Sequence, residues 1–135
     1  MKNKMRTGMK IGKFAGAVFI FLAIYLFSFA EAADYADQKA LALSLRFSVS
    51  RLPTDSSDDV AKEKEALYLR IINECPDTSE AEEAYWELSN LYLDGFDEPK
   101  EKEAVAVLER FLKELSDSPW ALHVNSRLKW LRGEN

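Results

Sequence analysis

The sequence of 135 residues contains very little cysteine, histidine or glycine. Cys75 is the one cysteine, so the chain cannot close an internal disulfide, and its stability must come from packing. His123 is the one histidine, whereas a metal site would need several histidine, cysteine or clustered acidic residues. Beyond residue 16 the glycines are Gly95 and Gly133, which excludes a glycine-rich loop that cradles a phosphate. We therefore expect no catalytic residues, no metal and no cofactor, and a protein that is not an enzyme.

Charge is absent from residues 14–30, an apolar run of seventeen residues. A basic segment precedes this run, and Ala30-Glu31-Ala32 follows it with an A-x-A cleavage pattern, so residues 1–32 are typical of a secretory signal peptide. As a helix the run would cover roughly 26 Å of a hydrocarbon core about 30 Å thick, so an uncleaved inner-membrane anchor at 14–30 is the alternative. Both interpretations predict that the remainder is periplasmic or otherwise extracytoplasmic.

Removal of residues 1–32 would leave a strongly acidic chain. It would remove five basic residues and one acidic residue, so the formal net charge would fall from −5 to −9. Such a surface repels nucleic acid and anionic lipid, and we expect no nucleic-acid partner. We expect contact with a membrane only if the N-terminal segment stays uncleaved.

The spacing of apolar residues predicts an all-α chain of about five helices. The first spans residues 34–52; its apolar residues also alternate as in a strand, but Ala36, Ala40 and Ala42 favour a helix. This helix and its following loop form an N-terminal cap over residues 33–57, and residues 58–135 form the main domain. The next helices are expected over 59–74 and 78–93, then from Pro99 and from Ser118-Pro119 onward. Gly95 is expected as a left-handed C-cap.

A shift of forty residues aligns the second and third helices with the fourth and fifth. The shift retains seven identities: Lys62/Lys102, Glu63/Glu103, Arg70/Arg110, Glu74/Glu114, Asp77/Asp117, Ala81/Ala121 and Leu88/Leu128. Apolar character is also retained at Cys75/Leu115, so Cys75 is expected to be a small buried hydrophobe. Helix pairs at this period indicate stacked repeats, in which each pair buries its apolar face against a neighbour.

Two consecutive helices carry a set of aromatic, leucine and small residues: Tyr85, Leu88, Tyr92, then Ala104, Leu108, Phe111. In this set the chain resembles the tetratricopeptide-repeat family, although Ser89 replaces the usual glycine. Residues 108–121 resemble its bacterial envelope branch, which includes outer-membrane assembly lipoproteins and the periplasmic protein that works with the Tol-Pal system. The resemblance implies a short solenoid of antiparallel helix pairs that binds a protein or peptide in the cell envelope, as a scaffold or assembly factor.

In the family, one side of the first helix of each pair lines a concave groove that holds peptide. The corresponding side chains here are Glu83, Trp86, Asn90, His123, Arg127 and Trp130. Trp86 and Trp130 would serve as aromatic anchors, while Asn90 and Arg127 would hold backbone or carboxylate groups. The alternative is that both tryptophans pack against the next helix. A self-associating or membrane-anchored structural domain without a peptide groove is the other function that the sequence leaves open.

Overall fold

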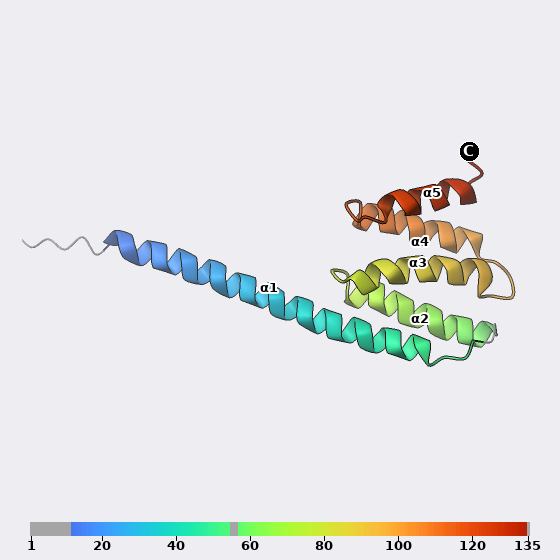
Figure 1. Ribbon diagram of the computed structural model, residues 1–135, viewed down its shortest axis with the longest axis horizontal. Helices are drawn as coiled ribbons and strands as arrows, with labels where there is room; N and C mark the ends of the chain where they lie inside the picture. The colour runs from blue at the N-terminus through green and yellow to red at the C-terminus, as the bar shows by residue number, and fades with distance from the viewer. Residues whose placement is uncertain (1–11, 55–56, 135) are drawn as a thin grey trace, which may run out of the picture. The chain divides into compact units, whose positions relative to one another are not determined.

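The structure, a computed structural model, describes residues 12–54 and 57–134, with side chains from residue 24 onward. All regular structure in these residues is helical, and they contain no strand. The helices are α1 (Gly12–Ser50), α2 (Asp58–Glu74), α3 (Ser79–Asp94), α4 (Glu101–Glu114) and α5 (Ala121–Leu131) (Figure 1). The expectation of an all-α chain of about five helices is confirmed.

The chain divides into two compact units, Met1–Asp34 and Tyr35–Asn135. In the first unit α1 begins at Gly12, and its large apolar side chains between Ile24 and Phe29 are exposed. Residues 1–11 and the side chains through residue 23 lie outside the described residues, so the signal peptide and the anchor at 14–30 stay predictions. No helix among the described residues is both long enough and apolar enough to cross a membrane.

The second unit contains the C-terminal part of α1 together with α2 to α5. The helices expected over 59–74 and 78–93 correspond to α2 and α3, with each boundary within one residue. Thr78 caps α3, because its hydroxyl accepts a hydrogen bond from the backbone N–H of Ala81 at 3.3 Å. The helix expected over 34–52 is the end of α1, which stops at Ser50.

The expectation of a left-handed conformation at Gly95 is wrong. Its φ is −97°, in the right-handed region, and its backbone N–H donates to the carbonyl of Leu91 at 2.8 Å. A Cβ atom at Gly95 would lie 2.4 Å from Cδ1 of Leu91 and 2.8 Å from its carbonyl oxygen. The position requires glycine for close approach, not for a positive φ. Gly133, by contrast, has a φ of 69°.

Two helix starts also differ from the expectation. Helix α4 begins at Glu101 and not at Pro99, because the backbone N–H of Lys100 donates to the carbonyl of Tyr92 at 2.7 Å and ties this turn to α3. Helix α5 begins at Ala121 and not at Ser118. Ser118 forms a turn instead, in which its hydroxyl accepts the N–H of Trp120 at 3.1 Å.

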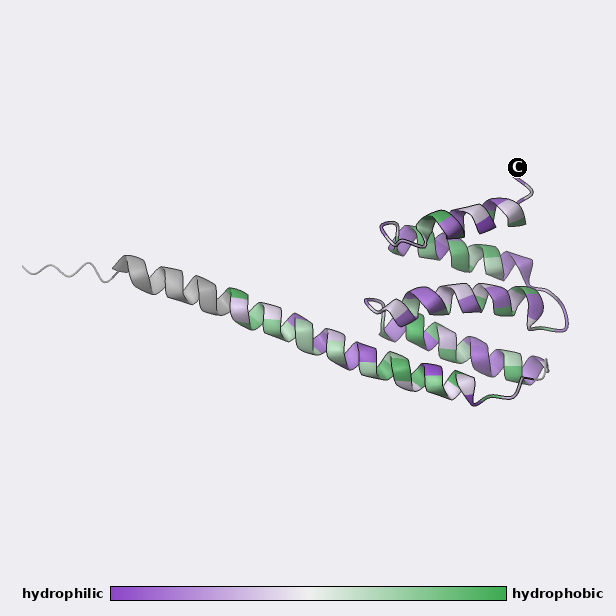
Figure 2. Cartoon of the chain, in the orientation of Figure 1, coloured by the Kyte–Doolittle hydropathy of each residue, from purple (hydrophilic) through white to green (hydrophobic). Residues whose placement is uncertain are grey.

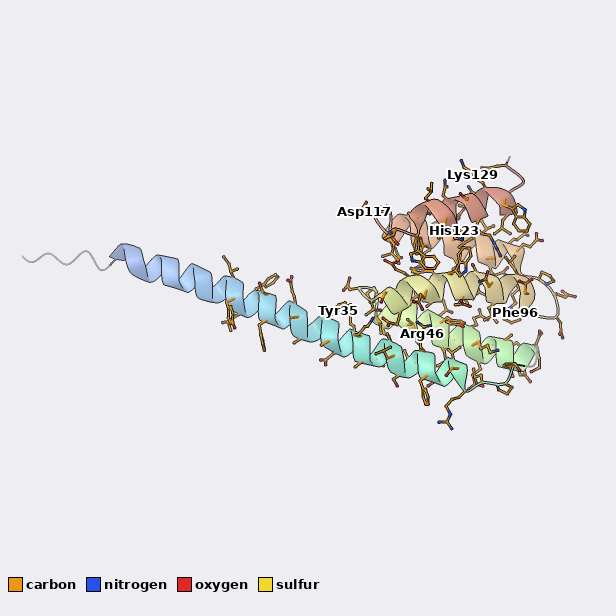
Figure 3. All side chains as sticks on the ribbon, in the orientation of Figure 1. Tyr35, Arg46, Phe96, Asp117, His123 and Lys129 are labelled. Carbon is orange, nitrogen blue, oxygen red and sulfur yellow. The ribbon has the colours of Figure 1, made fainter. Side chains whose placement is uncertain are left out.

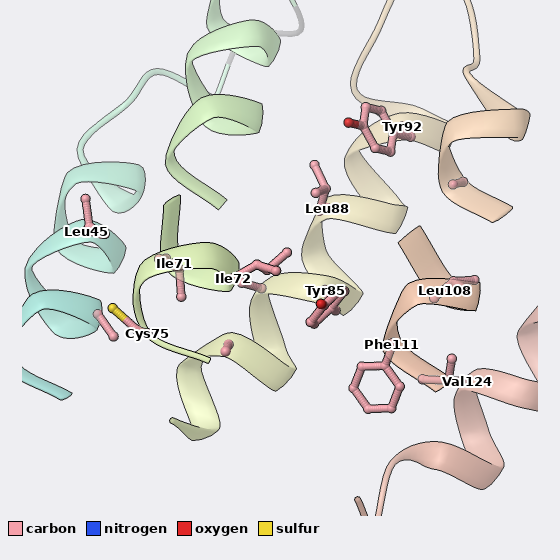
Figure 4. Close-up of a cluster of buried hydrophobic side chains, with 14 of the residues drawn as sticks. Leu45, Ile71, Ile72, Cys75, Tyr85, Leu88, Tyr92, Leu108, Phe111 and Val124 are labelled. Carbon is pink, nitrogen blue, oxygen red and sulfur yellow. The ribbon is translucent and has the colours of Figure 1, made fainter. Parts of the chain in front are cut away.

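Each helix from α2 to α5 packs against the next one in the chain (Figure 1). One cluster of buried apolar residues runs through the unit, from Ala42 and Leu45 on α1 to Val124 and Leu128 on α5. Between these residues the cluster contains Ile71, Ile72, Cys75, Tyr85, Leu88, Leu108 and Phe111 (Figure 4). Tyr85 meets Phe111 edge to face with ring centroids 5.5 Å apart. The core therefore joins all five helices of the unit.

Side chains also connect every second helix. Lys39 on α1 binds Glu80 on α3 at 2.6 Å, and Asn90 on α3 accepts a hydrogen bond from Arg127 on α5 at 3.3 Å. On the other side, Arg110 on α4 donates to Asn73 on α2 at 2.9 Å. Helices α1, α3 and α5 thus lie in one layer, and α2 and α4 lie in a second.

Candidate functional site

Helix α3 is the middle helix of the α1–α3–α5 layer, and the candidate site is built along it. Glu83, Trp86, Glu87 and Asn90 recur on α3 at spacings of three, one and three residues, which places them on one side of the helix. The opposite side carries the buried residues Ala81, Tyr85 and Leu88. The core thereby fixes the direction in which these four side chains project.

Two adjoining concavities lie between α1 and α3, over α2. Their volumes are about 240 and 290 Å³, and both are lined by Val49, Ser50, Tyr68 and Glu87. Glu83 lines the first, and Asn90 lines the second. The side of α3 that the sequence singled out therefore forms one wall of a continuous depression, which we call the α1–α3 groove.

The groove is lined by charged side chains of both signs. Across the groove, the carboxylate of Glu83 forms an ion pair with Arg46 on α1; Arg46 is labelled in Figure 3. Glu80, beneath it, is 6% exposed. Burial opposes the ionised form of Glu80, but the hydrogen bond from Lys39 and further polar contacts lower its pKa overall. Glu87 forms no ion pair with another described residue and remains exposed at the junction of the two concavities.

Tyr68 supplies the aromatic surface of the groove and lines both concavities. Burial raises the pKa of its hydroxyl, and the negative charge of Glu87 raises it further. At neutral pH the hydroxyl is protonated, as in any tyrosine, and can donate a hydrogen bond. A ligand in the groove would thus meet a neutral aromatic donor beside an unpaired carboxylate.

A group of rings and one guanidinium lies where α3 meets α5, which we call the tryptophan cluster. The ring centroid of Trp86 lies 4.8 Å from that of His123 and 6.3 Å from that of Trp120. His123 is labelled in Figure 3. The Arg127 guanidinium carbon is 5.3 Å from the Trp86 ring and 5.6 Å from the Trp130 ring. A cation–π contact between a guanidinium and an indole contributes about 0.5–2 kcal/mol, so the cluster stabilises the packing of α5 against α3.

Arg127 is one of two arginines in the described part of the chain that form no ion pair there. Arg46, Arg70, Arg110 and Arg132 each pair with a glutamate, whereas Arg127 and the exposed Arg51 pair with none there. The Nε of Arg127 is buried without an acceptor, and one terminal nitrogen donates to the Asn90 side chain at 3.3 Å. Its positive charge is therefore balanced by ring faces and one amide only.

The structure brings five of the six expected site residues together. Trp86, Asn90, His123, Arg127 and Trp130 form or adjoin the tryptophan cluster, whereas Glu83 lies on the α1 side of α3. Trp86 is half-buried and packs between α3 and α5, which agrees with the alternative that the tryptophans pack against a neighbouring helix. Trp130, at 68% exposure, does not.

Sequence reasoning missed Trp120, Tyr68 and Arg46. Trp120 is 39% exposed and contacts Trp86 from the turn before α5, a contact that its position in the sequence does not indicate. Tyr68 lies beside the buried residues Ile71 and Ile72 of α2 in the helical spacing, so its place in the groove could not be told from a place in the core. Arg46 gave no signal, because its partner Glu83 is 37 residues away and pairing over that distance depends on how the layers stack.

None of these side chains forms a nucleophile–base pair, and the described residues contain no group of three or more potential ligands that could hold a metal. The site combines a groove, an exposed indole, an unpaired carboxylate and a guanidinium without a carboxylate partner. No family model, curated protein or solved structure matches this chain.

Proposed function

We propose that the protein binds an extended segment of a partner protein along the α1–α3 groove. The observation that supports this most is the continuity of the surface. The groove runs from Glu83 past Glu87 to Asn90, and the side chain of Asn90 accepts a hydrogen bond from Arg127. A segment in the groove would place backbone groups near Tyr68 and Asn90, and a basic side chain near Glu87.

In this proposed function the helices are tetratricopeptide-like pairs that stack into a short solenoid. The pairs would be α1 with α2 and α3 with α4, and α5 would open a third. Two observations support it: alternate helices contact each other, and related contacts recur at similar separations. Arg46 pairs with Glu83 at 37 residues, and Asn90 accepts from Arg127 at 37 residues.

The proposed role is that of a scaffold or assembly factor in the cell envelope, without catalysis. The envelope location rests on the predicted signal peptide or anchor in residues 1–32. The resemblance to the envelope branch of the tetratricopeptide family supports the same location. The ligand is a protein segment, because a shallow groove of a few hundred Å³ lined by mixed charge offers no enclosed pocket for a small molecule.

Site-specific photo-crosslinking in cells that produce the full chain tests this function. A photoreactive residue at position 87, inside the groove, is expected to capture a discrete partner that mass spectrometry identifies. The same residue at Lys113, which is exposed on α4 in the other layer, is the matched control. Equal capture at both positions, or no capture at position 87, would argue against a groove ligand.

A charge reversal then tests whether the groove determines the affinity. Glu87→Lys replaces an exposed carboxylate, so it should leave the fold intact but weaken binding of the identified partner at least tenfold. Lys113→Glu is a comparable reversal outside the groove and should leave the affinity unchanged. Affinities are measured with the purified full chain by titration against the partner. Equal binding by the two variants would contradict the proposal.

A further inference from the structure

The outward face of the last four turns of α1 has no partner in the described structure. In the second unit α1 buries Ala42 and Leu45 against the core. The opposite face carries Ala36, Ala40, Leu43 and Phe47 at spacings of four, three and four residues, which we call the α1 outer stripe. Leu43 is 52% and Phe47 63% exposed. Figure 2 shows hydrophobic residues on this part of the helix.

A spacing of four and three residues is the seam of a two-helix coiled coil. The α1 outer stripe is also graded in size, because its two alanines come first and its two large residues come last. In an antiparallel pair of such helices, Phe47 of one copy faces Ala36 of the other, and Leu43 faces Ala40. Large side chains then fill the space above small ones, and the same contacts occur twice around a two-fold axis.

We propose that a second copy of this chain covers the α1 outer stripe, with the two α1 helices antiparallel. The two-fold axis passes between Ala40 and Leu43. Each copy contributes the same four side chains, so the interface is self-complementary and closes at two copies. The stripe lies opposite Ala42 and Leu45, and none of its four residues lines the α1–α3 groove. The dimer therefore leaves the groove open, and this inference is independent of the proposed function.

The charges beside the α1 outer stripe favour the antiparallel orientation. Asp37 lies near its first residue, and Arg51 follows its last, with the guanidinium 5.7 Å from the Phe47 ring. Antiparallel pairing brings Asp37 of one copy to the end of the helix that carries Arg51 of the other. Parallel pairing would place Asp37 beside Asp37 and Arg51 beside Arg51, which like-charge repulsion disfavours.

Thiol cross-linking distinguishes the two orientations in the full chain. A Cys75→Ala background removes the native thiol, and Ala36→Cys or Ala40→Cys is then introduced singly. In the antiparallel dimer the two residue-40 sites are about 4.5 Å apart along the helix axis, and the two residue-36 sites about 16 Å apart. A short bismaleimide should therefore link Ala40→Cys at least fivefold more than Ala36→Cys. Equal linking of both variants indicates parallel helices and overturns the proposal.

A disruption series tests the interface without relying on a reagent. The full chain, in mild detergent, is expected to show a concentration-dependent mass that approaches two copies in analytical ultracentrifugation. Leu43→Asp introduces charge into the α1 outer stripe and should give a monomer at all concentrations, with unchanged helical content because the side chain is exposed. Leu122→Asp is the matched control, since Leu122 is 78% exposed on α5, and this variant should remain dimeric. A monomeric parent chain, or a Leu43→Asp variant that still dimerises, overturns the proposal.

Discussion

Two tyrosines on α3 combine a buried ring with a hydroxyl that reaches a carboxylate on a neighbouring helix. Tyr85 is 2% exposed and donates to Glu114 on α4, while Tyr92 is 5% exposed and donates to Glu65 on α2 at 2.7 Å. Burial raises the pKa of both hydroxyls far above the usual value near 10, and the carboxylate partners raise it further. Each hydrogen bond links α3 to a neighbouring helix, and each requires that the tyrosine hydroxyl keeps its proton in the folded state.

The raised pKa of these two hydroxyls predicts that the folded state loses stability at alkaline pH. Because the native pKa is raised, the contribution of Tyr85 is complete below about pH 10 and is lost as the pH rises beyond it, where the unfolded chain ionises first. The slope of the unfolding free energy should become more negative by up to about 1.4 kcal/mol per pH unit for each tyrosine. Urea denaturation of the full chain from pH 8 to 11 measures it.

The variant Tyr85→Phe separates this effect from the titration of other groups. It retains the ring against Phe111 but has no proton to lose, so its stability should fall less steeply above pH 10 than that of the parent. Lysines titrate in the same range, but they are common to both proteins and cancel in the comparison. Parallel pH profiles for the two proteins would show that Tyr85 does not carry the dependence.

The buried residues were the easiest to predict from the sequence. Cys75 was expected in the core because the repeat matches it with Leu115, and it is fully buried, with burial raising the pKa of its thiol. The role of Trp86 could not be decided, because an aromatic beside a core stripe can face a groove or a neighbouring helix. Its actual contacts with His123 and Arg127 depend on where α5 lies, which no local pattern contains.

At the scale of elements, periodicity predicted where α2 and α3 lie, but the turn before α4 was misjudged. Proline at the first helical position is a local preference. Contacts across the turn prevailed over it: Lys100 donates its N–H to Tyr92, and its ammonium lies 3.4 Å from the centre of the Phe96 ring. The same reason explains Gly95, where Leu91 leaves no space for a Cβ atom.

Helix α5 is the element most dependent on the tryptophan cluster. It is the shortest of the five described helices, and it is held by Val124 and Leu128 on one side and by Trp86 on the other. Trp86→Ala should therefore destabilise the unit by about 2 kcal/mol, below the roughly 3–5 kcal/mol of a fully buried tryptophan. Hydrogen exchange should show lost protection in residues 121–131, with α2 and α3 still protected.

Trp130→Ala is the control for this element. Trp130 also contacts Arg127, but it is 68% exposed, so its removal should cost less than about 0.5 kcal/mol and leave exchange in α5 unchanged. If both variants lose protection in α5 equally, the exposed indole contributes as much as the packed one. If Trp86→Ala loses none, the α4 contacts alone hold the helix.

For the whole unit, the forty-residue period predicted stacked helices and a shared core, and the structure shows one apolar cluster from α1 to α5. The period did not predict which helices meet across a layer. Contacts such as Lys39 with Glu80 depend on the stagger between successive pairs, which is set by side-chain packing along the whole stack. The groove, whose walls come from different helices, was for this reason only partly visible in the sequence.

A continuous core predicts that residues 35–134 unfold as one cooperative unit, and the chain contains a probe at each end of the stack. Cys75, at the end of α2, is fully buried and should react with a thiol reagent only on unfolding. The three tryptophans lie on α3, on α5 and in the turn before α5, so their fluorescence reports the other end. Thiol exposure and fluorescence should share one urea midpoint because neither end can open without exposing the common core. Thiol reaction at lower urea would mean that the α1–α2 end opens by itself, and an earlier fluorescence change would mean the same for α5.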